Sequence, residues 1–197
     1  MNQYQDDDDA WYECNDDDLW IFDKLILSRK LGYICGPAGA YVPQPCRYIV
    51  RPCVNTEGLG RGARYEWLEK DTDFLPAGYF WCQVFEGRHI SVDYTNQQQG
   101  LTVEGFRKSW DPIYKFYKWK KINDEVKFPD VFKHLKYKYI NIEFIDEHII
   151  EIHLRHNSDF CDGDQEILPV WEEDQKCPDG YKFRKNSDGK RLGFFYR

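Results

Sequence analysis

The sequence predicts an α+β domain that is rich in mainly antiparallel strands and has only a few short helices. Two observations carry this prediction. Several short runs of β-branched and aromatic residues are bounded by Gly, Pro or Asp, as in strands joined by turns. Helical spacing of apolar residues is confined to short segments, at residues 17–31 and 128–135.

Composition supports a single packed core. The chain has 197 residues, of which 42% are hydrophobic and 17% aromatic, including seven Trp. A chain of this length and composition buries enough surface to fold as one domain. No repeat or low-complexity linker divides it, so we expect a single compact domain over residues 19–197. Residues 1–18 are expected to form an acidic, mobile N-terminal extension.

Several features predict a cytoplasmic protein without a membrane segment. No run of 18 or more apolar residues is present, and the N-terminus lacks the basic and apolar regions of a signal peptide. The seven cysteines are scattered and form no CxxC pair. This usage predicts reduced thiols rather than a disulfide framework or a zinc ribbon.

The N-terminal half begins with a helix and continues into strands. In residues 17–31, Leu19, Phe22, Leu25, Ile26 and Leu31 share one face, and acidic residues occupy the first turn. A segment rich in Gly and Pro then breaks the chain into turns. Tyr48 to Val50 begin a strand that stops at Pro52, and NTEGLGRGA follows as a Gly-rich loop.

The later strands are predicted to pair as hairpins. YFWCQVFEG, ending at Gly87, is expected to pair with RHISVDY. Residues 138–156 predict two strands joined tightly at Asp146-Glu147, and the C-terminal tail predicts a last hairpin that turns at residues 187–189. Between them, Pro129 is expected to initiate a short helix over residues 128–135.

Candidate chemistry concentrates in the hairpin NIEFIDEHIIEIHLRHN. Glu151, His153 and Arg155 alternate with apolar residues and project from one face of the second strand. Glu143 on the first strand and Glu151 can converge on a hard cation, which prefers oxygen ligands. His153 would be a third ligand or bond a phosphate oxygen, and Arg155 offers a planar fork for a carboxylate or phosphate. Alternating charges on an exposed sheet face explain the same pattern without a site.

This hairpin resembles the metal-binding hairpin of the ATP-grasp superfamily, most closely the form in biotin carboxylase-like members. The resemblance implies two mainly antiparallel sheets that hold a nucleotide between them. It implies that Glu143 and Glu151 bind the Mg²⁺ ions that bridge the phosphates of ATP, and that Arg155 holds an acidic substrate. His153 stands where the family usually has Asn, which puts the second metal position in question, and Asn157 is a candidate substitute.

Other segments resemble parts of the same superfamily in the same order, over residues 23–160. DKLILSRKLGY resembles its lysine-bearing helix, where Lys24 or Lys30 would reach the phosphates. YIVRPCVNTEGLGRGA resembles its phosphate strand and loop, with Arg51 in place of a Lys. WCQVFEGRHISVDY resembles the hinge that holds adenine and ribose. The implied nucleotide ligands are Lys24, Arg51, Gly58, Gly60, Gln83, Phe85 and His89.

The resemblance also has a gap at the N-terminus. ATP-grasp enzymes usually carry an N-terminal α/β domain, and here only the acidic extension precedes the match. The expectation is a minimal enzyme, a subunit that needs a partner or a second copy of itself, or a non-catalytic descendant. Compact relatives of this kind, some of them phage-encoded, are the most similar overall.

The function implied by this resemblance is an ATP- and magnesium-dependent ligase that joins a small-molecule or peptide carboxylate to an amine, or to another nucleophile, through an acyl phosphate. Arg51 and Arg155 would be its catalytic residues. The alternative is a non-catalytic nucleotide-binding module that retains the same cleft. GxSxG, HExxH and Walker A motifs are absent from the sequence, which argues against hydrolase and P-loop assignments.

A third reading concerns a basic, aromatic stretch. Residues 107–138 hold ten Lys or Arg against four Asp or Glu, interleaved with aromatic residues. Such a stretch can follow a phosphate backbone and stack bases, which predicts a single-stranded nucleic acid as partner or substrate. A solvated face with its aromatic residues turned inward explains the same composition.

Overall fold

Three short helical segments begin the part of the chain that the computed structural model describes, residues 7–55, 58–186 and 191–197. They are α1 (Asp7–Glu13), the 3-10 helix η1 (Asp16–Phe22) and α2 (Lys24–Lys30). The single helix expected over residues 17–31 is wrong, because it is interrupted at Asp23. The Asp23 carboxylate accepts hydrogen bonds from the backbone N–H of Leu25 at 2.8 Å and Ile26 at 3.0 Å. Asp23 therefore starts a new helix as its N-cap.

Part of the acidic N-terminal segment packs on the rest of the molecule. Ala10 in α1 is 3% exposed and belongs to the largest core cluster. The ring of Trp11 lies 5.1 Å from that of Phe22. The segment expected to be a mobile extension thus includes a helix with a buried contact, while residues 1–6 lie outside the described residues.

The smaller sheet has four antiparallel strands in the order β1-β4-β2-β3. Its strands are β1 (Cys35–Pro37), β2 (Cys46–Pro52), β3 (Arg64–Leu68) and β4 (Tyr79–Gln83). The strand expected to stop at Pro52 is confirmed as β2. Tyr48, Val50 and Trp81 lie in the core of this sheet.

The larger sheet has eight antiparallel strands in the order β11-β12-β10-β7-β6-β5-β8-β9. Its strands are β5 (His89–Thr95), β6 (Gln98–Arg107), β7 (Phe116–Lys121), β8 (Tyr139–Ile145), β9 (His148–His153), β10 (Glu166–Val170), β11 (Lys182–Lys185) and β12 (Gly193–Tyr196). The hairpin that turns at Asp146-Glu147 is confirmed by the pairing of β8 with β9. The C-terminal strand pair is confirmed as β11 and β12, and its predicted turn at residues 187–189 lies outside the described residues.

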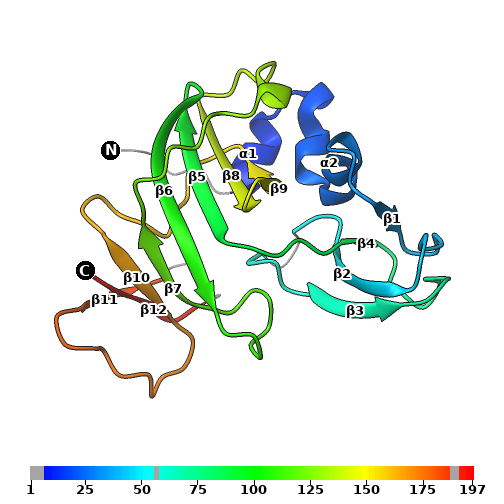
Figure 1. Ribbon diagram of the computed structural model, residues 1–197. Coiled ribbons are helices and arrows are strands. Elements are labelled where there is room, and N and C mark those ends of the chain that lie inside the picture. The colour runs from blue at the N-terminus through cyan, green and yellow to red at the C-terminus, as the bar shows by residue number, and fades with distance from the viewer. Residues whose placement is uncertain (1–6, 56–57, 187–190) are drawn as a thin grey trace.

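The hairpin predicted around Gly87 is wrong. β4 pairs with β1 and β2 in the smaller sheet, whereas β5 pairs with β6 and β8 in the larger one. Residues 84–88 instead connect the two sheets, which lie side by side in Figure 1. Adjacent strand patterns in the sequence do not distinguish a hairpin from a crossing between sheets, because both need only a short turn.

The segment 128–135 forms one 3-10 turn, η2 (Asp130–Phe132), rather than the expected helix. Phe132 is 1% exposed and Leu135 is fully buried. These two side chains anchor the turn against the core of the larger sheet.

The two faces of the larger sheet differ in chemistry. On β8, Ile140, Ile142 and Phe144 pack into the main core with α1, η1 and η2 nearby. The alternate residues Asn141, Glu143 and Ile145 face a cavity on the opposite side, as the two-residue period of a strand requires. Among the described residues, no helix has the length and apolar character to span a bilayer.

Candidate functional site

A cavity of about 250 Å³ lies between the two sheets. Its wall combines α2, the strand β2 and the loop after it, the 84–88 connection, and strands of the larger sheet. Eleven residues that the sequence nominated for the site lie in this wall: Lys24, Arg51, Gly58, Gly60, Gln83, Phe85, His89, Glu143, Glu151, His153 and Arg155. The structure therefore brings all of them together, and the individual roles assigned to them stay predictions.

Two carboxylates face each other across the β8–β9 hairpin. Glu143 and Glu151 are direct partners in the strand register, and a bulge follows between Glu143 and Phe144. Like charges directly opposite each other on paired strands are destabilising. The pair therefore needs compensation nearby, and the structure places three basic side chains there, on α2, β5 and β9.

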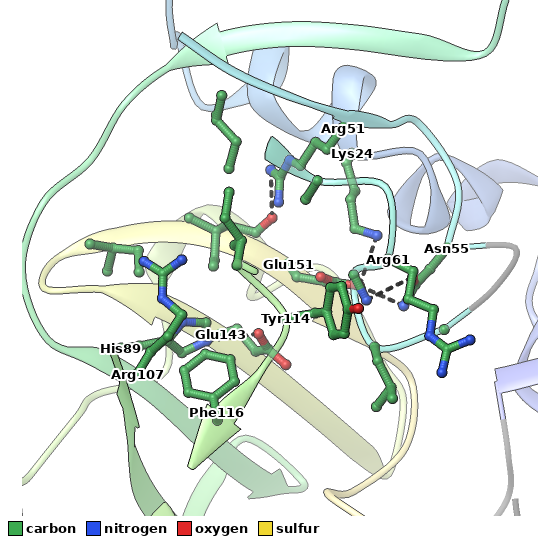
Figure 2. Close-up of a pocket in the computed structure, with 18 of the residues that line it drawn as sticks. Lys24, Arg51, Asn55, Arg61, His89, Arg107, Tyr114, Phe116, Glu143 and Glu151 are labelled. Carbon is green, nitrogen blue, oxygen red and sulfur yellow. Dashed lines mark hydrogen bonds and ion pairs between the residues drawn. The ribbon is translucent and has the colours of Figure 1, made fainter. Parts of the chain in front are cut away.

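The first of these side chains is Lys24. Its Nζ lies 3.1 Å from Oε1 of Glu151, and the two side chains are only 6% and 14% exposed. Asn55 Nδ2 donates a longer hydrogen bond, at 3.4 Å, to the same oxygen. Figure 2 shows Lys24 and Asn55 converging on Glu151 from the side of the smaller sheet. The sequence left open whether Lys24 or Lys30 enters the site; Lys30 instead lies over the ring of Trp20.

The other two basic groups are imidazoles. His89 Nε2 lies 3.0 Å from Oε2 of Glu143 and donates to it, because an ionised carboxylate only accepts. Burial raises the pKa of Glu143, but the hydrogen bond and charge of His89, with the other nearby cations, lower it to about 2. His153 Nε2 lies between the carboxylates, 3.5 Å from Glu151 and 3.9 Å from Glu143. Glu143 is therefore ionised at neutral pH.

Arg51 contributes a buried positive charge. The residue is 9% exposed, and its guanidinium donates to the carbonyl oxygen of Ile150 at 3.1 Å. Its Nε is buried with no hydrogen-bond partner in the described part of the chain. A buried donor without a partner is costly.

The loop between β2 and β3 forms another part of the wall. Gly58 and Gly60 both have positive φ values, 68° and 69°, which glycine adopts without strain. The side-chain oxygen of Asn55 accepts a hydrogen bond from the backbone N–H of Gly60 at 3.2 Å. Asn55 thus links the loop to Glu151, and no sequence pattern had singled it out.

Gln83, the last residue of β4, and Phe85, in the 84–88 connection, are each held by a side-chain contact. The Gln83 side-chain oxygen accepts from the backbone N–H of Ile34 at 2.8 Å. The ring of Phe85 stacks on His148, with centroids 4.2 Å apart. This end of the cavity therefore combines a planar apolar surface with backbone groups, a combination that suits a flat heterocycle.

Arg155 and Asn157 lie beyond the end of β9 and also line the cavity. Arg155 donates to the carbonyl oxygen of His156 at 3.0 Å. The backbone N–H of Asn157 donates to Oδ1 of Asp93 at 2.8 Å, and Asn141 donates to the same oxygen. Burial raises the pKa of Asp93 against the lowering effect of these hydrogen bonds. Asp93 therefore fixes the segment that carries Arg155.

An aromatic wall is the largest part of the cavity that the sequence did not assign to it. Tyr114, Phe116 and Trp119 line the cavity together with Arg107, and Figure 2 shows Arg107 and Phe116 beside His89. The ring centroids of Phe116 and Trp119 are 4.5 Å apart. These residues belong to the basic, aromatic stretch 107–138, whose composition was the available signal. Binding of nucleic acid by this stretch stays a prediction.

The donor set fits magnesium held partly by phosphates. Within the described residues, no group of three or more His, Cys, Asp or Glu is arranged to hold a metal by itself. Mg²⁺ in nucleotide sites usually uses one or two carboxylates, with waters and phosphate oxygens completing the shell. The facing carboxylates of Glu143 and Glu151 meet that requirement. His153 has imidazole chemistry and is the least suited of the three to a hard cation.

Comparisons with known proteins give matches among solved structures. No family model matches the sequence, and no curated protein matches it. Similar structures include a protein from Archaeoglobus fulgidus described as belonging to the ATP-grasp superfamily, with 19% identity and a TM-score of 0.44. The ATP-grasp ligase PsnB, complexed with a minimal precursor, has 15% identity and a TM-score of 0.43. D-alanine–D-alanine ligase from Bacillus anthracis, complexed with ATP, has 12% identity and a TM-score of 0.40.

The matches cover 69%, 70% and 69% of this chain, respectively. They cover 46%, 52% and 55% of the three solved chains. The chain therefore spans about half the length of the proteins that it resembles.

Proposed function

We propose that this protein binds ATP with magnesium in the cavity between its sheets and uses it to join a carboxylate to an amine. One observation carries the proposal. Two carboxylates, Glu143 and Glu151, face each other on one wall, and the buried cations of Lys24 and Arg51 enter from the other side. Anionic phosphates with a divalent cation complement this arrangement of charges.

Each part of the wall has a role in this proposal. Gln83, Phe85 and His89 would hold the base and ribose, and Lys24, Arg51 and the Gly58–Gly60 loop would hold the phosphates. Glu143 and Glu151 would hold the metal, with His153 beside them. The metal supplies charge neutralisation at the phosphate oxygens. Arg155, fixed through Asp93, would orient the substrate carboxylate.

The reaction has two steps. A carboxylate oxygen of the acid attacks the terminal phosphorus of ATP, forming an acyl phosphate and releasing ADP. The amine nitrogen then attacks the acyl carbon, the bond from carbon to the phosphate oxygen breaks, and inorganic phosphate leaves. The proton lost by the amine passes to solvent. Positioning and charge neutralisation account for most of the catalysis of phosphoryl transfer, so no covalent intermediate on the protein is required.

The first test is a calorimetric titration of ATP with and without Mg²⁺. We expect magnesium-dependent binding that weakens at least about tenfold in Glu143→Ala and Glu151→Ala, which corresponds to about 1.4 kcal/mol. Glu173→Ala is the matched control, since Glu173 is exposed and lies outside the cavity. Equal affinity in all four proteins would overturn the metal assignment.

Turnover is tested with Glu151→Gln, which keeps the shape of the side chain and removes its charge. We expect release of ADP to fall at least about 100-fold because the developing charge on the phosphates loses its neutralisation. Circular dichroism checks that the variant is folded, and Glu173→Gln is the control. Full ADP release by Glu151→Gln would contradict the assigned role.

A non-catalytic nucleotide-binding module is the second candidate. Its supporting observation is that Glu151 Oε1 is already engaged by Lys24 and Asn55, so a metal must compete with a buried ion pair. This candidate predicts magnesium-independent nucleotide binding and no ADP release with any acid and amine offered. Magnesium dependence in the titration above distinguishes the two.

A further inference from the structure

A second cavity, of about 400 Å³, adjoins the first on the far side of Glu151. Four residues line both cavities: Lys24, Asn55, Glu151 and His153. The Lys24–Glu151 ion pair and the His153 imidazole therefore form a partition between them. The polar part of the second cavity's lining is therefore next to the groups proposed to surround the phosphates.

The rest of the second cavity is apolar. It is lined by Trp11, Tyr12, Ile21, Phe22, Val54 and Ile152. Four of these come from α1 and η1, so the N-terminal segment builds most of this wall. The rings of Trp11 and Phe22 pack together, 5.1 Å between centroids. A ligand that is apolar except for one polar end would match this lining, because the lining is apolar except at the partition.

The elements that form the apolar wall, α1 and η1, are strongly acidic, and this charge favours a positively charged ligand over an anion. Residues 7–23 carry eight acidic side chains and no Lys or Arg. Asp9, Glu13, Asp16 and Asp17 among them are exposed. A dense set of carboxylates creates a negative potential that attracts cations and repels anions. Aromatic faces, which Trp11 and Tyr12 offer, add attraction for an ammonium group.

We propose that this second cavity binds a primary amine with an aromatic or aliphatic body, as the nucleophile of the ligase reaction. The assignment of this amine as the nucleophile rests on the proposed function. The prediction that the second cavity binds an amine depends on the lining of that cavity alone. The N-terminal segment would then provide an acceptor site, with α1 and η1 as its outer wall and the partition as its inner end.

The probes are 2-phenylethylamine and 3-phenylpropionate, which carry the same ring on a short chain and differ in the sign of their charge. Each is titrated into the full chain without nucleotide, followed by calorimetry. We expect the amine to bind and the acid to bind at least about tenfold more weakly, a difference of about 1.4 kcal/mol. An acid that binds as tightly as the amine would overturn the proposal.

Two substitutions locate the binding. Val54→Trp fills the cavity, and Val131→Trp is its control because Val131 is also exposed and lines neither cavity. We expect at least about a tenfold loss of amine affinity in Val54→Trp and none in Val131→Trp. Tyr12→Ala removes a ring that is 86% exposed, so the fold should persist while amine affinity falls several-fold.

Failure of this inference is distinguishable from failure of the proposed function. Magnesium-dependent ATP binding with an amine affinity that Val54→Trp and Tyr12→Ala leave unchanged would reject the acceptor site and keep the nucleotide site. Amine binding that both variants weaken, in a protein that does not bind ATP, would keep the cavity and reject the ligase. Where Val54→Trp also weakens ATP binding, Tyr12→Ala decides, because Tyr12 does not line the first cavity.

Discussion

At the scale of single residues, the site depends on the side chains that compensate two neighbouring carboxylates on the larger sheet. Glu143 and Glu151 occupy facing positions that would repel each other. Lys24, His89 and His153 lie within ion-pair distance of one or the other. This arrangement leaves neither carboxylate buried and uncompensated, and a bound cation would have to compete with these partners.

The lowered pKa of Glu143 predicts a pH-dependent stability. Its folded-state pKa of about 2 lies below its ordinary value of 4.5. The contribution is therefore complete above about pH 5 and is lost as the pH falls toward 2. We expect wild type to exceed Glu143→Gln in unfolding free energy by up to about 3 kcal/mol at pH 6.

Urea unfolding of both proteins between pH 6 and pH 2.5 measures this effect. The difference between them should shrink steadily toward acid. Glu173→Gln, at an exposed position, is the control and should show no such trend. A difference between wild type and Glu143→Gln that stays constant across this range would contradict the assigned ion pair.

At the scale of secondary-structure elements, local signals were sufficient where the chain turns directly back on itself. The β8–β9 hairpin follows from alternation and from the turn at Asp146, whose φ of 48° is the left-handed conformation that Asp tolerates. The relation of β4 to β5 did not follow, because β4 pairs back with β1 and β2 while β5 pairs forward with β6 and β8. The break between η1 and α2 did not follow either, because the apolar pattern is continuous across Asp23, which acts as the N-cap of α2.

A glycine substitution in the loop between β2 and β3 can separate the effect of backbone strain on stability from the effect of the loop on nucleotide binding. Gly60 has a φ of 69°, and a Cβ added there would meet nothing within 4 Å. Gly60→Ala should therefore lose about 1 kcal/mol of stability from backbone strain alone. Gly180, with a φ of 81° and equally open space, is the matched control and lies outside both cavities.

We expect the two alanine variants to unfold at similar urea concentrations but to differ in nucleotide binding. Gly60→Ala should weaken magnesium-dependent ATP binding several-fold, since the loop must approach phosphate oxygens closely. Gly180→Ala should bind ATP as wild type does. Equal ATP affinity in both variants would indicate that the loop does not contact the nucleotide.

At the scale of the whole molecule, the two sheets are joined by residues 84–88 and by contacts across the cavity. Lys24 belongs to α2, which packs against both β1 of the smaller sheet and β9 of the larger one. Its ion pair with Glu151 joins α2 to the larger sheet, and the hydrogen bond from Arg51 to Ile150 crosses between the two sheets. The cavity that would bind the nucleotide is thus also the place where the two sheets are held together.

Lys24→Met tests this coupling. Removing one partner of a buried ion pair leaves the other uncompensated, and we expect a loss of about 3 kcal/mol in unfolding free energy. Lys30→Met is the control on the same helix, where the lysine is exposed. Urea unfolding should show a large loss only for Lys24→Met, and similar stability of the two variants would mean that the pair contributes little.

The strand-rich α+β class and the β8–β9 hairpin could be predicted from the sequence, and the eleven candidate site residues that it nominated line one cavity, although their roles stay predictions. These features depend on local periodicity, turn residues and motifs in a fixed order. The positions of Tyr114, Phe116 and Trp119 in the same cavity and the contact of Asn55 with Glu151 follow from the tertiary structure. It also placed the acidic N-terminal segment beside Glu151 as the wall of a second cavity. Such contacts join residues far apart in sequence, and no local pattern specifies which faces meet.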